Sequence, residues 1–162
     1  MLSALAAFFL LIATLTVVAN NVYMATTMES ANQTLRQIEA ERETVTWQKI
    51  FLNNLFISLP LVIPAIGLIP FLFAWVNTGA TIGMLAKATG IQPATYVLTV
   101  ATLAFPEILA YTLLTAENIY LSALTLTGAG AKARLGHSWK TIIFYMLLLF
   151  IGAVSEALML GS

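Results

Sequence analysis

The sequence predicts an all-α membrane protein: a polytopic helix bundle of about five transmembrane helices plus one extramembrane amphipathic helix. Hydrophobic residues make up 60% of its 162 residues and charged residues only 9%, whereas roughly a quarter of an average soluble domain is charged. The mean hydropathy is +0.92. The apolar residues also gather in runs long enough to cross a hydrocarbon core, which takes about 20 residues. A soluble protein of this size cannot bury so much apolar surface.

The first two segments of the chain differ sharply in charge. Residues 1–28 contain no charged side chain and form the first predicted transmembrane helix. A signal peptide is disfavoured because the segment lacks a basic start and its apolar run exceeds roughly 15 residues. Residues 29–49 carry half of all charged residues and no Gly or Pro. Their apolar side chains recur at helical spacing, which predicts an amphipathic helix outside the bilayer, on the side opposite the N-terminus.

Residues 50–162 form the predicted helical membrane core. The uncharged run 50–86 is too long for one crossing and is interrupted by Pro and Gly near its middle. We therefore expect two helices, about 50–66 and 70–88, joined by a tight turn. A broken, re-entrant pair is the alternative, which is tolerated only where its backbone is buried in protein. Further helices are expected over 94–127, kinked at Pro106, and over 141–160, with four crossings as the fallback.

Glu107 is the most informative polar residue, because the surrounding stretch 88–116 is otherwise free of charge. A carboxylate at membrane depth costs several kcal/mol unless it is neutralised or paired. On a helix, Tyr111 and Asn118 share the face of Glu107. We interpret these residues, with Asn53 and Asn54 as amide partners, either as polar contacts between helices or as a proton or cation site.

Small residues predict a close contact between two helices. Gly79 and Gly83 are four residues apart, so they lie on one helix face and allow a neighbouring backbone to approach. We also expect Pro106 to affect helix packing, because it interrupts a later helix.

The sequence offers little catalytic or metal-binding chemistry. It has no Cys, no Asp and a single His, which removes disulfides, thiolate nucleophiles and most metal sites. His137 stands alone in the polar loop 128–140. We therefore predict no catalytic residue, no metal site, no cofactor and no enzyme activity. The net charge of +0 and the absence of a basic patch also argue against nucleic-acid binding.

Four short motifs occur in an order that resembles the SpoIIM-like family (stage II sporulation protein M and its relatives). They are Phe51-Leu52-Asn53-Asn54, Asn77-Thr78-Gly79 with Gly83, Phe105-Pro106-Glu107-Ile108, and Ser155-Glu156-Ala157 in the last helix. The family usually has a His-Gly pair shortly before the Glu, where this sequence has Leu103-Ala104. The resemblance implies a multi-helix membrane protein that works with other membrane proteins.

Two functions follow as expectations. The first is a non-catalytic scaffold or accessory subunit of a larger complex in the cell membrane. Its partners would be the lipid bilayer, other integral membrane proteins and, in a homo-oligomer, further copies of the chain. The alternative is a small transporter or channel protomer that uses Glu107 as an intramembrane proton or cation site. The two differ in whether Glu107 points into a helix seam or into a water-filled cavity.

Overall fold

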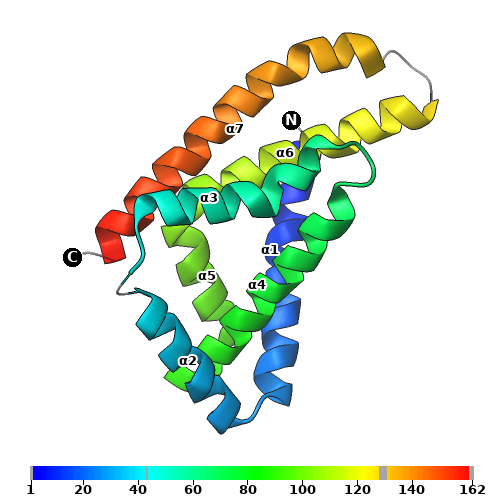
Figure 1. The fold of residues 1–162 in the computed structure, drawn as a ribbon. Coiled ribbons are helices and arrows are strands. Elements are labelled where there is room, and N and C mark those ends of the chain that lie inside the picture. Colours follow the sequence, from blue (N-terminus) through cyan, green and yellow to red (C-terminus); the bar gives the residue numbers. More distant parts are fainter. Residues whose placement is uncertain (1, 43, 128–130, 161–162) are drawn as a thin grey trace.

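The computed structural model describes residues 2–42, 44–127 and 131–160. Over these residues all regular structure is helical, which confirms the predicted all-α class (Figure 1). The elements are α1 (Leu2–Ala25), α2 (Met28–Arg42), α3 (Trp47–Ser58), the 3-10 turn η1 (Leu59–Val62), α4 (Leu68–Thr89), α5 (Pro93–Leu103), α6 (Phe105–Thr127) and α7 (Ala131–Leu160).

The described residues contain three or four candidate membrane spans, which does not confirm the expected five and is compatible with the fallback of four. In the described part of the chain, α1, α4 and α7 contain stretches long and apolar enough to cross a bilayer, and the bent pair α5–α6 can supply a fourth span. Five crossings are therefore not confirmed. The expected helix over 50–66 is replaced by α3, which has 12 residues. At 1.5 Å per residue α3 is about 18 Å long, well short of a hydrocarbon core of about 30 Å.

Helices α1 and α4 form the central pair, and they run parallel. Their contacts advance in the same direction along both helices, from Trp75 Nε1, which donates to Leu11 O at 3.0 Å, to Lys87 Nζ, which donates to Tyr23 O at 2.9 Å. A parallel pair requires the chain between them to return to the side where α1 began. Helices α2 and α3 share this return, and α2 packs beside the end of α4 (Figure 1).

Glycines allow the close approach of α1 and α4. A Cβ added to Gly83 would lie 2.5 Å from the backbone oxygen of Ala19, and one added to Gly79 would lie 3.0 Å from Val18 Cβ. Both glycines are buried. The two helices therefore touch backbone to backbone at these positions, where a larger residue does not fit.

The predicted kinked helix over 94–127 is two separate helices. α5 and α6 meet at Ala104 with an angle of 88° between them. The Pro106 ring would clash with the carbonyl four residues earlier if one helix continued through it. Pro106 instead lies in the first turn of α6, where a missing N–H costs nothing. α6 then packs along α7 and crosses α1 (Figure 1).

The chain between α3 and α4 is irregular, and side chains of α6 hold its backbone in place. Asn118 Nδ2 donates to the carbonyl oxygens of Leu61 and Ile63, both at 2.7 Å. Ser122 Oγ accepts a hydrogen bond from Ala65 N at 2.6 Å, and Ala65 has a left-handed φ of 64°. This is the arrangement that the broken-pair alternative requires, because non-helical backbone at membrane depth needs partners in the protein.

Candidate functional site

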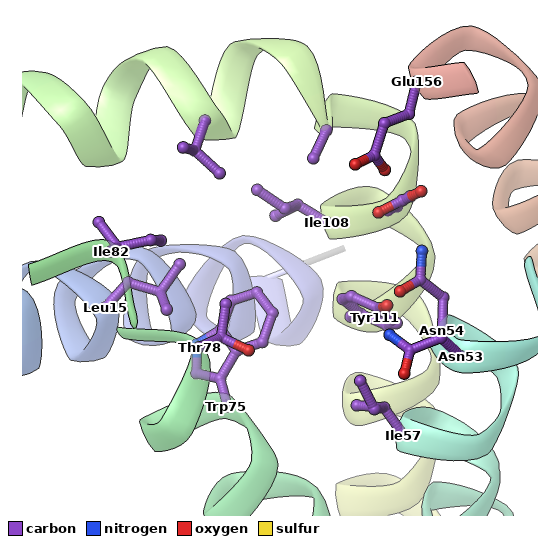
Figure 2. Close-up of a pocket in the computed structure, with 13 residues that line it drawn as sticks. Leu15, Asn53, Asn54, Ile57, Trp75, Thr78, Ile82, Ile108, Tyr111 and Glu156 are labelled. Atoms are coloured by element: carbon purple, nitrogen blue, oxygen red, sulfur yellow. The ribbon is translucent and has the colours of Figure 1, made fainter. Parts of the chain in front are cut away.

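A cavity of about 240 Å³ lies among α1, α3, α4, α5, α6 and α7. Its polar lining comes from four helices: Asn53, Asn54, Thr78, Glu107, Tyr111 and Glu156. The rest of the wall is apolar and includes Trp75. Figure 2 shows Asn54 and Glu156 directed toward the same part of this space, with the rings of Trp75 and Tyr111 on its wall. An apolar cavity with a few converging polar groups is the usual form of a small-ligand site.

Glu107 is placed in the cavity wall by the break between α5 and α6. It lies in the first turn of α6, directly after Pro106, and its side chain is only 6% exposed. Its Oε1 atom is buried and has no hydrogen-bond partner. The side chain also contacts α7, because a Cβ added to Gly152 would overlap Glu107 Cγ. Gly152 therefore provides the space in which the Glu107 side chain lies.

The two adjacent asparagines of α3 have different surroundings. Asn54 is 8% exposed and lies near enough to Glu107 to interact with its carboxyl. Even so, Asn54 Nδ2 has no partner within normal hydrogen-bond geometry. Asn53 also borders the cavity but is exposed. The structure thus places a buried amide and a buried carboxyl close together in one cavity, without a hydrogen bond of normal geometry to Asn54 Nδ2 or Glu107 Oε1.

Glu156 is a second carboxyl of this cavity, and the sequence analysis did not include it among the site residues. It is half-buried, and its charge acts on Glu107 across the cavity. The signal that would have found it is its place in the last helix of the chain, in the Ser155-Glu156-Ala157 motif. Two carboxyls in a poorly hydrated space repel each other when both are charged, which favours a bound cation or proton.

Aromatic side chains form a fixed wall of the cavity. The ring of Trp75 stacks on Phe71 with centroids 5.8 Å apart and meets Tyr111 at 79° with centroids 5.6 Å apart. The indole N–H is already bonded to the Leu11 carbonyl. The orientation of Trp75 is therefore fixed. It contributes its aromatic ring to the cavity wall, and its N–H is not available to a ligand.

The other predicted residues lie outside this cavity. Asn118 faces the irregular segment between α3 and α4, and Gly79 and Gly83 lie at the α1 contact. Glu117 accepts a hydrogen bond from Ser138 of α7 at 2.7 Å. The structure thus brings together Glu107, Tyr111, Asn53 and Asn54 and separates them from Asn118, which was expected on the same helix face.

A larger cavity of about 440 Å³ borders the first and leads toward the α2–α3 turn. The two share Asn53, Asn54 and Glu156, and the outer one is also lined by Glu41 and Lys49. A third cavity, of about 410 Å³, is lined by Arg42 and again by Glu156. Glu156 therefore lines the inner cavity and also two outer cavities that are lined by charged side chains.

No metal cluster is present in the part of the chain that the structure describes. There, no three or more His, Cys, Asp or Glu side chains are grouped so that they could hold a metal ion. His137, the single His of the sequence, has a side chain outside the described set. The site's chemistry must therefore come from its two carboxyls, the amides, the hydroxyls and the aromatic rings.

Comparison of the chain with family models, with curated proteins and with solved structures gives no match. The resemblance to the SpoIIM-like family thus rests on the sequence motifs and stays a prediction. Function has to be argued from the site itself.

Proposed function

We propose that the protein is a small transporter or channel protomer of the cell membrane, in which Glu107 binds a proton or another cation. The observation that carries the proposal is the buried carboxyl in a cavity wall, with Oε1 lacking a partner. An unpaired charge in such surroundings costs several kcal/mol. A proton or another cation would neutralise this carboxyl, whose nearby amide, Asn54, carries no charge.

The broken helix around Glu107 supports this proposal. Membrane transporters commonly bind substrates and coupling ions where a helix is interrupted, because helix ends leave backbone groups free to interact. α5 ends at Leu103 and α6 begins at Phe105 with an angle of 88° between them. Glu107 lies one turn or less from this break.

Access to the site also supports the proposal. The outer cavity brings the polar α2–α3 turn next to Asn53, Asn54 and Glu156. Lys49, the basic residue of that cavity, is tied by its Nζ to the backbone oxygen of Thr44 at 2.8 Å. A cation can therefore approach Glu156 without first displacing a lysine from the carboxyl.

Flux through reconstituted vesicles tests the role of Glu107. Glu107→Gln keeps the shape of the side chain and removes its charge, so we expect the variant to assemble normally and to lose cation- or proton-coupled flux. Glu39→Gln is the matched control, since Glu39 is an exposed carboxyl on α2. The proposal fails if Glu107→Gln transports as fast as the unmodified protein.

A scaffold or accessory subunit is the second proposal, and the contact between Glu107 and Gly152 favours it. In that role the carboxyl side chain would fix the seam between α6 and α7, and the SpoIIM-like motifs would imply other membrane proteins as partners. Glu107→Ala should then impair assembly while Glu107→Gln does not, with no flux through either. Size-exclusion chromatography of the complex purified in mild detergent measures this difference.

A further inference from the structure

We infer that the ligand of the inner cavity is a small organic ammonium cation, held between the carboxyls of Glu107 and Glu156 and the rings of Trp75 and Tyr111. The inference rests on the proposed function, because it names the cation that Glu107 binds. Three observations carry it: the size and largely apolar wall of the cavity, the two carboxyls, and the fixed aromatic corner.

The cavity is too large and too apolar for a bare metal ion. Hard cations need several oxygen ligands converging at about 2.0–2.6 Å. The space measures about 240 Å³, which is much larger than a single bare metal ion. Much of the wall consists of aliphatic side chains, such as Leu15, Ile57 and Ile82. Such walls suit the alkyl groups of an organic cation.

The two carboxyls supply the charge that such a cation needs. Glu107 is 6% exposed with an unpartnered Oε1, and Glu156 acts on it electrostatically. Lys49 and Arg42 border the outer cavities, but neither lines the inner one. A bound ammonium group therefore faces carboxyls and no fixed positive charge within the inner cavity.

The aromatic rings supply a second, independent attraction. A cation over the face of an aromatic ring is attracted by the ring quadrupole, and quaternary ammonium groups are commonly bound in aromatic cages. Trp75 and Tyr111 meet at 79° and so form a corner (Figure 2). Phe71 supports Trp75 from behind, and the bond to Leu11 O fixes the indole. The corner therefore exists before the ligand arrives.

Direct binding to the full-length protein in detergent tests the inference, with radiolabelled choline as the probe. We expect saturable binding that tetramethylammonium displaces. An equal concentration of Na⁺ should not displace it, and neither should 3,3-dimethylbutan-1-ol, the neutral analogue of choline. Competition by the neutral analogue as strong as that by tetramethylammonium would overturn the inference, because the cavity would then select for shape alone.

Variants separate the contributions of the carboxyls and the rings. Glu107→Gln should weaken choline binding by about tenfold or more, because a charge-assisted contact is lost. Trp75→Leu should weaken it by about three- to tenfold, whereas Trp139→Leu, at an exposed indole of α7, should leave it unchanged. Tyr111→Leu is a second ring variant in case Trp75→Leu does not fold.

A thermal-shift measurement tests choline binding without a transport assay. Choline should raise the melting temperature of the unmodified protein by mass action and, at the same concentration, should raise that of Glu107→Gln clearly less. If choline neither binds nor stabilises while flux still depends on Glu107, the organic-cation inference is wrong and the proposed function stands. If flux does not depend on Glu107 either, both are wrong.

Discussion

Glu107 and Gly152 occupy one small volume between α6 and α7, and this pair sets where the carboxyl lies. Gly152 is buried and has no side chain, so the Glu107 stem passes directly over its Cα. Sequence reasoning could find Glu107, because a lone carboxylate in an apolar stretch is conspicuous. It could not find Gly152, because a single Gly in an apolar helix gives no indication of which side chain it faces.

Gly152→Ala should destabilise the fold by about 1–3 kcal/mol, because the added methyl overlaps the stem of Glu107. The same substitution in a Glu107→Ala background should cost much less, since the overlapping atoms are gone. A double-mutant cycle of unfolding in detergent measures this coupling. Equal costs in both backgrounds would show that the two residues do not touch.

At the scale of the elements, local sequence signals found the helices but not their mutual geometry. Pro106 was expected to interrupt a helix and does so, yet the angle of 88° depends on how α6 packs across α1 and along α7. Asn118 was expected to share the site of Glu107. It instead binds Leu61 O and Ile63 O, because the irregular chain before α4 presents two carbonyls to α6. No local sequence pattern predicts that contact between α6 and the irregular segment.

Asn118→Ala should lower the free energy of unfolding by roughly 1–3 kcal/mol, because the buried carbonyl of Leu61 loses its donor and Ile63 O loses one of two. Asn77→Ala is the matched control, since Asn77 is exposed on α4, and it should change stability by less than about 0.5 kcal/mol. Chemical denaturation in mixed micelles measures both. An equal, small effect of the two substitutions would contradict the assigned role of Asn118.

Gly83→Leu should destabilise the α1–α4 pair by about 1–3 kcal/mol or more, because its side chain has to displace the Ala19 backbone. Gly136→Leu serves as the control, since no heavy atom lies within 4 Å of a Cβ built there. Thermal unfolding of the two variants should differ clearly. Unchanged stability of Gly83→Leu would show that α1 and α4 do not touch at this position.

At the scale of the whole molecule, composition alone was enough to predict an all-helical fold with long apolar helices, but it could not fix the number of candidate spans. Residues 50–66 are as apolar as a membrane helix, yet the chain divides them between α3, η1 and a turn. The parallel course of α1 and α4 makes a return through α2 and α3 necessary. The charged residues of α2 and of the α2–α3 turn are thereby brought beside the cavities.

Cysteine labelling of this Cys-free chain tests the arrangement in a membrane. Gln37→Cys, on the exposed face of α2, should react with a membrane-impermeant maleimide from one side of sealed vesicles. Phe73 lies on α4, is 71% exposed and has other exposed hydrophobic residues near it in the sequence. Lipid should therefore protect Phe73→Cys from the reagent. Protection of Gln37→Cys from both sides would mean that α2 lies within the bilayer.

The hydrogen bonds of Asn118 also bear on how the chain is made. The carbonyl of Leu61 precedes its donor by 57 residues, which corresponds to roughly 3–11 s of synthesis at about 5–20 residues per second. During that interval the carbonyl of Leu61 lacks the donor that hydrocarbon cannot replace, whereas Ile63 O already accepts from Gly67 N at 3.0 Å. We expect the segment before α4 to stay at the membrane surface, or inside the insertion machinery, until α6 has been made. We therefore expect insertion of α4 to its final depth to be a late step that depends on synthesis of α6.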